Sequence, residues 1–258
     1  MGFRALSSPL LSPVRVDDRL RPRLADGRRT TVHVARWDLA RTRVRIERLD
    51  GQQRVLDWCA AHAIPDALVG GFYTRPAGLP LGELRLAGKA VEHVPFTAPW
   101  NASRASLHVT ARGARIDRRD ELPARPGGDL LQAGPLLVRG GEVVCHDDDD
   151  AEGFSACADQ FDSDITSVRH PRSAVGITDG EVIAVVADGR SRGDAGLTLS
   201  ELAQVVAGLG AHSAMNLDGG GSASLVCDGL LRNRPRERHG IDLAGGRAVT
   251  TVIAFDAI

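Results

Sequence analysis

The sequence predicts an α+β fold, with a mixed, mostly antiparallel β-sheet core and a few packed helices. Short runs of apolar and β-branched residues recur along the 258-residue chain, as the strands of a partly buried sheet do. Between two of these runs, Asp179-Gly180 is a dipeptide typical of a β-hairpin turn. Only one segment combines a helical apolar stripe with recognisable caps, which indicates that strands outnumber helices.

The chain is expected to begin with an irregular arm over residues 1–30, which are rich in Pro, Arg and Asp, followed by one domain over residues 31–258. Val55 to Ala63 is expected to form a short helix that ends near Pro65. Alternating or continuous apolar residues predict strands at 31–35, 44–49, 106–111, 136–138, 174–177 and 182–187.

The clearest helix is expected from Leu199 to about Leu209. Thr198 is placed to cap its N-terminus and Glu201 to complete a capping box, so both have a structural explanation. Gly210 stands where a left-handed residue often ends a helix. One face of the helix is apolar, made of Leu199, Leu202, Val205, Val206 and Leu209. After it, the β-branched run at 248–255 is almost continuously apolar, which predicts a strand in the middle of a sheet.

Charge and hydropathy exclude several classes of function. The formal net charge is -1, which does not favour nucleic acid or an anionic membrane surface as a partner. No window approaches the roughly 20 apolar residues that a membrane-spanning helix needs. The apolar run at the N-terminus is broken by Ser and Pro and is not interpreted as a signal peptide, so a cytoplasmic protein is expected. The Arg- and Ala-rich composition favours a bacterial source, and nothing in the sequence sets an oligomeric state.

The four cysteines, at 59, 145, 157 and 227, contain no C-x-x-C pair, which argues against a structural zinc site. Cys145 and Cys157 flank an acidic segment that a disulfide would close. Without an export signal, reduced thiols are the favoured interpretation.

The segment from Asn216 to Ser222, Asn-Leu-Asp-Gly-Gly-Gly-Ser, is the most informative stretch of the chain. It lies between two expected strands, at 213–216 and 223–227, and is therefore a loop. Glycine loses more conformational freedom on folding than any other residue, so three in succession indicate a close approach of the main chain to another group. Successive free N–H groups suit an anion such as phosphate. A plain tight turn is the simpler alternative.

This loop resembles the signature of the phosphodiester glycosidase family. Other segments follow the order and approximate spacing of that family, namely 172–176, 186–190, 196–203, 209–211, 233–235 and 246–249, and the resemblance extends more weakly to 70–73 and 134–138. It covers mainly residues 170–258. One residue departs from the pattern: the family usually has Asn before its Gly-Gly-Phe, and this chain has Val69.

The resemblance implies a hydrolase that cleaves the glycosidic bond of a sugar-1-phosphodiester, such as an N-acetylglucosamine-1-phosphate ester, in carbohydrate metabolism. Asp218 and Asp188 are then the expected carboxylates, which stabilise the anomeric centre or activate water. Arg172 and Arg190 are expected to clamp the phosphate, because a guanidinium matches phosphate oxygens. The further expected substrate-binding residues are Asn216, Gly219, Gly220, Gly221, Ser222, Asn233, Arg247 and Gly71.

Each of these residues has a structural alternative. Asp218 is also suited to an Asx turn, because Asp commonly bonds the backbone two residues on. Asp188-Gly-Arg190 has the composition of a plain turn with a solvated Arg. Arg172 has the alternative of a surface ion pair, and Asn216 that of orienting the loop without touching a substrate.

No cofactor is required by these patterns, and no metal ligands are assigned. The acidic run at 146–150 offers oxygen ligands of the kind that calcium or magnesium prefers, but a solvated loop is the favoured interpretation. Ser222 lacks the final Gly of the G-x-S-x-G elbow, which argues against a serine hydrolase. The alternative to a glycosidase is a non-catalytic phosphosugar- or glycan-binding module of the same fold, suggested by Val69. Retention of the charged motif residues favours the enzyme.

Overall fold

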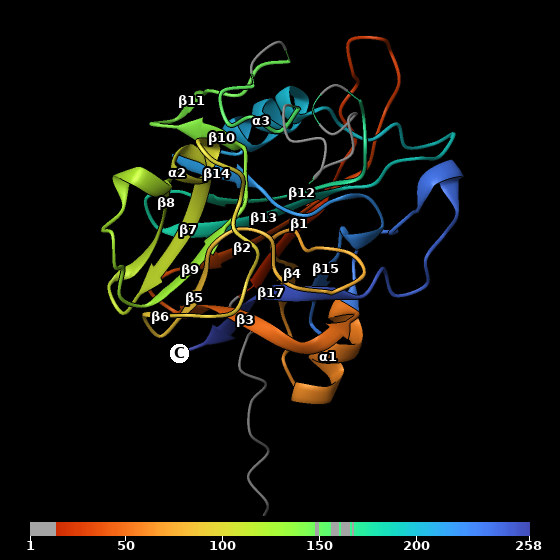
Figure 1. Cartoon of the computed structure of the whole chain (residues 1–258). Coiled ribbons are helices and arrows are strands. Elements are labelled where there is room, and N and C mark those ends of the chain that lie inside the picture. Colours follow the sequence, from red (N-terminus) through yellow and green to blue (C-terminus); the bar gives the residue numbers. More distant parts are fainter. Residues whose placement is uncertain (1–13, 148–149, 156–159, 161–165, 167) are drawn as a thin grey trace, which may run out of the picture.

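Three β-sheets form the framework of the protein (Figure 1). The computed structural model describes residues 14–147, 150–155, 160, 166 and 168–258. Within these residues, the paired strands of all three sheets run antiparallel, and an isolated bridge between Leu81 and Val94 is parallel. The expected α+β fold with a mostly antiparallel core and few helices is confirmed.

The largest sheet has seven strands and contains the hairpin expected at Asp179-Gly180. In spatial order its strands are β1 (Val14–Leu20), β2 (Val32–Asp38), β13 (Glu181–Ala187), β12 (Arg172–Ile177), β14 (Ser213–Asn216), β10 (Leu136–Arg139) and β11 (Glu142–Val143). The strand β1 corrects the expected irregular arm at 1–30, because residues 14–20 pair with β2; residues 1–13 lie outside the described chain.

Each of the other two sheets has five strands. One consists of β16 (Leu230–Leu231), β15 (Leu225–Cys227), β4 (Ala67–Val69), β17 (Val249–Ala257) and β3 (Thr42–Gln53). Here β17 pairs on both sides, which confirms its predicted place inside a sheet. The other consists of β6 (Lys89–Ala90), β5 (Leu84–Leu86), β9 (Asp129–Gln132), β7 (Ala105–Thr110) and β8 (Gly113–Arg118).

Helices are short. The α-helices are α1 (Val55–His62), α2 (Trp100–Ser103) and α3 (Leu199–Gly208), and the 3-10 turns are η1 (Arg119–Glu121), η2 (Gly220–Ser222) and η3 (Arg238–Gly240). The Thr198 hydroxyl accepts a hydrogen bond from the Glu201 amide at 3.1 Å, and the Glu201 side chain accepts one from the Thr198 amide at 3.0 Å. The predicted capping box is confirmed, and Gly210 has the predicted positive φ, +86°.

The seven-stranded sheet is buried on both faces, because alternate residues of its central strands enter different cores. In β13, Val182, Ala184 and Val186 join the large core that also contains β17 and β4 side chains. Ile183, Val185 and Ala187 point instead into a second core, beneath α3. The helices α3 and α1 lie at opposite ends of the molecule in the view of Figure 1. A sheet fixed from both sides gives its strand ends well-defined positions.

Three strand ends of the central sheet meet at one edge. Arg172, at the start of β12, is opposite Ala187, at the end of β13. Asn216, at the end of β14, is opposite Ala174 on the other side of β12. The loops that follow β13 and β14 therefore leave the sheet at the same edge, on either side of β12. The Gly70 carbonyl, just after β4, accepts a hydrogen bond from the Asp218 amide at 3.1 Å, which joins a second sheet to this edge.

Cys59 and Cys227 are buried free thiols. Burial is the main cause that raises the pKa of each to about 12, so both are protonated at neutral pH. Reduced thiols were predicted for them. The alternative Cys145–Cys157 disulfide involves Cys157, which lies outside the described residues.

Candidate active site

A pocket of about 870 Å³ opens at the edge where these strand ends meet. Its lining contains two carboxylates, Asp218 and Glu237, and five guanidinium groups from Arg75, Arg172, Arg190, Arg238 and Arg247. The remaining walls include Phe72, Tyr73, His170, Pro171, Asn216, Gly219 and Gly220. Positive side chains outnumber negative ones, so the pocket favours an anionic ligand.

Asp218 is the carboxylate that the glycine loop brings into the pocket. Its Oδ1 accepts a hydrogen bond from the Gly219 amide at 2.9 Å, and the Ser222 hydroxyl also bonds to the carboxylate. Burial is the largest influence and raises the pKa of Asp218 above its usual value. The Ser222 bond, the charge of Arg247, the Gly219 bond and the charge of Arg75 oppose that rise, because each favours the ionised form.

The backbone of the glycine loop is held by the protein itself. The Gly220 amide donates to the Pro171 carbonyl at 2.8 Å, and the Ser222 amide donates to the Gly219 carbonyl at 3.1 Å. Together with the bond from Gly219 to Asp218, two of the three amides predicted to cradle phosphate, those of Gly219 and Gly220, are engaged by protein acceptors. The expectation of an anion held by these two amides is therefore corrected: the loop shapes the pocket and orients Asp218, and guanidinium groups supply the positive charge.

Close packing explains why the loop needs glycine. A Cβ on Gly219 would lie 2.7 Å from the Pro171 carbonyl oxygen, and one on Gly221 would lie 2.8 Å from Leu243 Cδ1. Gly220 has φ +61°, and its Cβ would lie 3.1 Å from Arg190 Nη1. Gly221 and Ser222, both expected to bind substrate, lie behind the wall formed by Gly219 and Gly220 and are not among the pocket-lining residues.

The two arginines predicted to clamp phosphate both line the pocket. Arg172 is buried, and its Nε and Nη2 donate to the carbonyls of Leu197 and Val168 at 3.1 and 3.0 Å. Arg190 donates to the Arg236 carbonyl at 3.1 Å and lies 3.2 Å from the ring nitrogen Nδ1 of His170. Arg190 has φ +59°, a strained conformation for a non-glycine residue that is common at functional sites.

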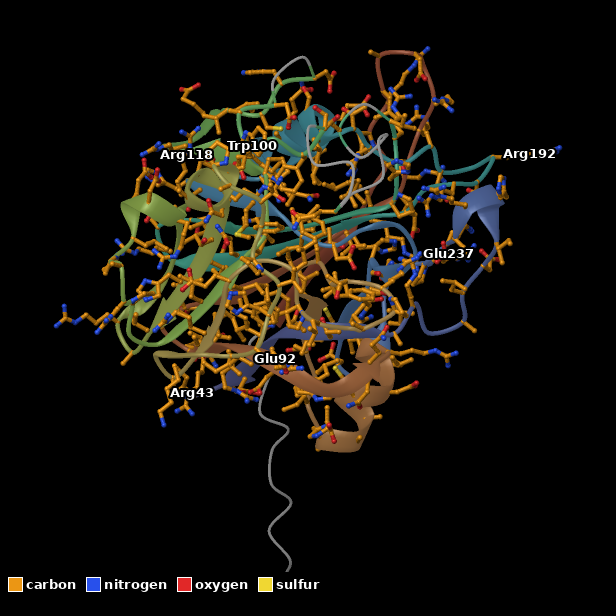
Figure 2. All side chains as sticks on the ribbon, viewed as in Figure 1. Arg43, Glu92, Trp100, Arg118, Arg192 and Glu237 are labelled. Carbon is orange, nitrogen blue, oxygen red and sulfur yellow. The ribbon has the colours of Figure 1, made fainter. Side chains whose placement is uncertain are left out.

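Arg247 also lines the pocket. It links Glu237, which was not predicted from the sequence, to the predicted residues Ser222 and Asp218. Its guanidinium pairs with the Glu237 carboxylate, with Nε to Oε1 at 2.7 Å, and its Nη1 donates to the Ser222 hydroxyl oxygen at 3.4 Å. Because Ser222 in turn bonds Asp218, the pair Glu237–Arg247 is linked through one hydroxyl to the pocket carboxylate. Glu237 precedes η3, and Figure 2 shows it on the same side of the molecule as Arg192.

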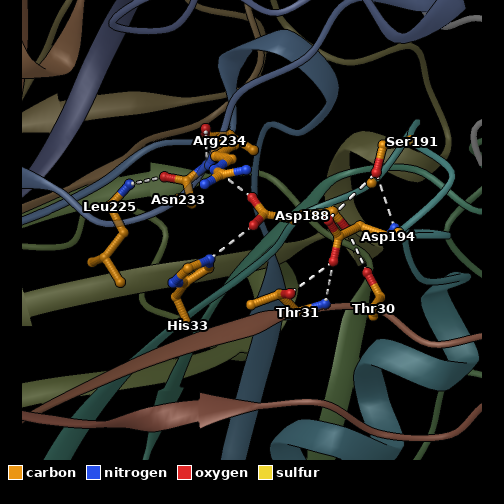
Figure 3. A network of polar contacts seen from close by, with 12 residues as sticks. Thr30, Thr31, His33, Asp188, Ser191, Asp194, Leu225, Asn233 and Arg234 are labelled. Atoms are coloured by element: carbon orange, nitrogen blue, oxygen red, sulfur yellow. Dashed lines mark hydrogen bonds and ion pairs between the residues drawn. The ribbon is translucent and has the colours of Figure 1, made fainter.

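Asp188, the second predicted carboxylate, is not among the pocket-lining residues. Its side chain is buried, and its Oδ2 lies 3.0 Å from His33 Nε2 while its Oδ1 accepts from the Arg234 amide at 2.7 Å (Figure 3). The Thr30 hydroxyl donates to its carbonyl at 2.6 Å. This corrects the expectation that Asp188 faces the substrate. Its bonds instead tie β2 and the segment around Arg234 to the loop that carries Arg190.

Asn233 and Gly71 are likewise used by the fold, which corrects their expected place in the pocket. Asn233 accepts from the Leu225 amide at 3.0 Å and donates to the Ala223 carbonyl at 2.8 Å, so it braces the segment after the glycine loop (Figure 3). The Gly71 amide donates to the Thr251 hydroxyl at 3.0 Å, and a Cβ on Gly71 would lie 3.2 Å from Leu131. Neither residue is among those that line the pocket.

Asn216 lines the pocket as predicted. Its Nδ2 donates to the Gly134 carbonyl at 2.9 Å, which fixes the orientation of the amide. Its Oδ1 is buried and has no hydrogen-bond partner among the described residues. An unpaired buried acceptor costs about 1–3 kcal/mol, so this oxygen favours a ligand that brings a donor into the pocket.

The sequence prediction missed six charged or aromatic residues of the pocket: Phe72, Tyr73, Arg75, His170, Glu237 and Arg238. Most of these lie within a few residues of a motif that was recognised. Tyr73 ends the Gly70–Tyr73 segment and Arg75 follows it, while Glu237 and Arg238 follow Asn233–Pro235. The sequence signal for these residues was their proximity to the recognised segments. That signal does not indicate which of the neighbouring side chains point into the pocket.

Within the described residues, no group of three or more His, Cys, Asp or Glu side chains is arranged to hold a metal ion. Asp148 and Asp149, from the acidic run, lie outside those residues. Asp150 accepts hydrogen bonds from the amides of Phe154 and Ser155 at 2.6 and 2.9 Å, which is the pattern of a turn. No described helix is long and apolar enough to cross a membrane.

Comparison with known proteins gives the family. A family model described as phosphodiester glycosidase matches residues 64–256, most of the chain. This protein belongs to the phosphodiester glycosidase family. The matched range contains all the pocket-lining residues, including Asp218 and the five arginines.

Curated relatives of this protein include two mammalian proteins. The mouse N-acetylglucosamine-1-phosphodiester alpha-N-acetylglucosaminidase is 29% identical over 171 residues, and its bovine counterpart is 27% identical over 171 residues. Each match covers 65% of this chain and 32% of the relative, so this chain matches about a third of the length of either protein. An uncharacterised prophage-derived protein from Bacillus subtilis, YomE, is 36% identical over 68 residues, which is 26% of this chain and 11% of that protein.

Solved structures share the fold. The catalytic domain of the zebrafish N-acetylglucosamine-1-phosphodiester alpha-N-acetylglucosaminidase, auto-inhibited by its pro-peptide, aligns with a TM-score of 0.71 at 20% identity, covering 97% of this chain and 84% of that one. A putative exported protein from Burkholderia pseudomallei aligns with a TM-score of 0.69 at 17% identity, covering 89% of this chain and 74% of that one. At these identities the likeness shows the fold alone.

Proposed function

We propose that this protein hydrolyses the glycosidic bond of a sugar-1-phosphodiester, of which an N-acetylglucosamine-1-phosphate ester is the model substrate. The observation that carries the proposal is the position of Asp218: one half-buried carboxylate in a pocket whose other charged groups are mostly arginines. The guanidinium groups suit the phosphodiester, and the carboxylate suits a carbon that becomes positively charged. Family membership supports the same reaction class.

The chemistry demands little help for the leaving group. Water attacks the anomeric carbon, the bond from that carbon to the phosphate oxygen breaks, and the bonding electrons leave with a phosphate monoester. The second pKa of such a monoester is about 6, so it departs without the strong general acid that an alcohol requires. Positive charge beside the departing oxygen stabilises it further, which is the role we give to Arg172 and Arg190.

Asp218 acts in its ionised form in this scheme. The carboxylate stabilises the oxocarbenium-like transition state and accepts the proton that the attacking water loses. Its bonds from Gly219 and Ser222 hold the side chain in one orientation, so little reorganisation is needed as charge develops. The unpaired Oδ1 of Asn216 is then an acceptor for a hydroxyl or amide N–H of the sugar.

A panel assay tests this proposal. Release of free sugar is measured from sugar-1-phosphodiesters and from alkyl glycosides of the same sugar. We expect turnover of the phosphodiesters to be much faster, because an alkoxide is a far poorer leaving group. We also expect activity to survive EDTA, since arginines provide the positive charge. Equal rates on both substrate classes, or loss of activity in EDTA with recovery on adding calcium or magnesium, would contradict the scheme.

The second candidate is a phosphosugar- or glycan-binding module that does not turn over its ligand. It is favoured by Val69, which is fully buried in the large apolar core, is not among the pocket-lining residues, and stands where the family usually has Asn. Saturable binding of a sugar phosphate without release of free sugar from any phosphodiester of the panel would select this candidate.

A further inference from the structure

We propose that Arg75 is a specificity-determining residue that contacts the anionic phosphodiester group, and that Tyr73 holds it in place. This inference deepens the proposed function, because it names the side chain that distinguishes an anionic leaving group from a neutral one. Neither residue belongs to the set predicted from the sequence. Both line the pocket.

Arg75 lies in a short turn whose backbone is well braced. The Thr74 amide donates to the Leu79 carbonyl at 2.8 Å, and the Gly78 amide donates to the Thr74 carbonyl at 2.8 Å. At the base of the turn, Tyr73 forms a β-bridge with Pro80. These bonds fix the place at which the Arg75 side chain leaves the chain, on the wall of the pocket.

Tyr73 supplies a platform for this guanidinium. Arg75 Cζ lies 5.9 Å from the centroid of the Tyr73 ring, within the range at which a cation is attracted to an aromatic face. Tyr73 is half-buried, and it is the only tyrosine of the chain. A rigid ring with a polar tip limits the freedom of the neighbouring cation without neutralising its charge.

The N–H donors of Arg75 remain unused within the described part of the protein, whereas those of its neighbours are partly engaged. Arg172 donates to two carbonyls, Arg190 to a third, and Arg247 is paired with Glu237. The Arg75 side chain, by contrast, has no hydrogen bond or ion pair with any residue that the structure describes, and it is exposed. Its field nevertheless reaches the reaction centre, since it is one of the charges that lower the pKa of Asp218.

An exposed guanidinium without a hydrogen-bond or ion-pair partner among the described residues, in the same pocket as the half-buried Asp218 carboxylate, is suited to a phosphate oxygen of a substrate that reaches both residues. In a sugar-1-phosphodiester, the anomeric carbon and the phosphate are separated by one oxygen atom. A substrate whose anomeric carbon lies at Asp218 therefore has its phosphate within the field of Arg75. A neutral leaving group gains nothing from this residue.

The single tyrosine allows a direct test that needs no turnover. Protein labelled with ¹³C at the tyrosine ring gives signals from Tyr73 alone, and these are followed by NMR during titration with inorganic phosphate and then with a dialkyl phosphodiester. We expect a saturable shift in the wild type and about tenfold weaker binding in Arg75→Gln, because one charge-assisted contact is lost. The matched control is Arg112→Gln, an exposed arginine of the β7–β8 turn that does not line the pocket.

Unchanged phosphate affinity in Arg75→Gln, or no response of Tyr73 in the wild type, would overturn the inference. A kinetic arm separates it from the proposed reaction. With an active enzyme, Arg75→Gln is expected to raise KM for the phosphodiester about tenfold and to leave a neutral aryl glycoside unaffected. Phosphate binding that depends on Arg75 in a protein without turnover would support the contact while refuting the hydrolase.

Discussion

The Asp218 carboxylate accepts a hydrogen bond from the amide of Gly219, the residue that follows it, at 2.9 Å. The first glycine of the loop thus fixes the orientation of the Asp218 carboxylate. Pro171 approaches the same glycine so closely that a Cβ would lie 2.7 Å from its carbonyl oxygen. Gly219 therefore couples the orientation of the pocket carboxylate to the chain segment that leads into Arg172.

Replacement of Asp218 by Asn is expected to stabilise the protein at neutral pH. The folded-state pKa of Asp218 is raised above its usual 3.8, so the folded protein pays a cost for the ionised form that the unfolded chain does not. Asn keeps the shape and an acceptor oxygen but removes the charge. Thermal unfolding at pH 7 should give a higher Tm for Asp218→Asn than for the wild type.

The control is the pH dependence of the difference in Tm between Asp218→Asn and the wild type. Below about pH 3.8, Asp218 is protonated in both folded and unfolded states, so the advantage of the Asn variant should disappear. A variant that is less stable than the wild type at pH 7 would show that the hydrogen bonds to the carboxylate outweigh its burial.

The glycine loop should tolerate alanine poorly, and differently at each position. Gly219→Ala meets a backbone oxygen and is expected to reduce both folding stability and activity severely. Gly220→Ala has a positive φ and meets the movable Arg190 side chain, so a loss of about 1–2 kcal/mol in the free energy of unfolding is expected. Urea unfolding and phosphate binding measure the two effects.

Gly208, near the end of α3, is the matched control. A Cβ there would meet nothing within 4 Å, and helical Gly→Ala substitutions stabilise by about 0.5–1 kcal/mol. Equal effects of alanine at 208 and 220 would mean that the loop is not tightly packed against the pocket.

Glu237→Gln is expected to move the acidic limb of the pH–activity profile to lower pH. Glu237 neutralises Arg247, whose positive charge favours the ionised form of Asp218. Without the glutamate charge, the pKa of Asp218 should fall, and activity that needs its carboxylate should persist to lower pH by about one pH unit or less. The exposed Glu92, far from Glu237 in Figure 2, gives the control Glu92→Gln. A shift to higher pH would indicate that Arg247 leaves the site when its partner is removed.

Glu152 should make folding stability depend on pH. This buried carboxyl accepts hydrogen bonds from the amides of Leu136 and Ala105 at 2.6 and 3.0 Å, and burial raises its pKa from 4.5 to about 7. Between these two values the folded protein holds a proton that the unfolded chain releases, so stability falls as pH rises from 4.5 to 7.

The variant Glu152→Gln removes this titration. It is expected to lower stability overall by about 1–3 kcal/mol, because its side chain can accept with one oxygen only. Its unfolding free energy should nevertheless change less between pH 4.5 and 7 than that of the wild type. The unfolding free energy of both proteins is measured with urea across this pH range. If it changes with pH as much in Glu152→Gln as in the wild type, the titrating group is not Glu152.

Much of the fold followed from local sequence signals. The capping box of Thr198 and Glu201 and the hairpin at Asp179-Gly180 depend on neighbouring residues, and both were predicted correctly. The strand Val14–Leu20 was not, because its stability comes from pairing with β2 and its own composition is that of a loop.

Only part of the candidate site was predicted, again because local sequence signals do not include tertiary contacts. Asp218 and Arg172 sit at strand ends that a motif marks, and both line the pocket. Asp188 also follows a strand, but its side chain turns toward His33, a contact made across 155 positions of sequence. Arg75 and Glu237 reach the pocket from turns whose direction is set by tertiary contacts. A motif indicates which segments meet, whereas the direction of each side chain depends on the packing around it.

The rate of free-sugar release from a sugar-1-phosphodiester, compared between the wild type and Asp218→Asn, tests the central claim most directly. We expect measurable turnover by the wild type and a loss of about 10²-fold or more in kcat for the variant, because a fixed charge that stabilises the transition state is removed. Circular dichroism and retained phosphate binding would show that the variant is folded. Wild-type activity in a folded Asp218→Asn protein would contradict the account.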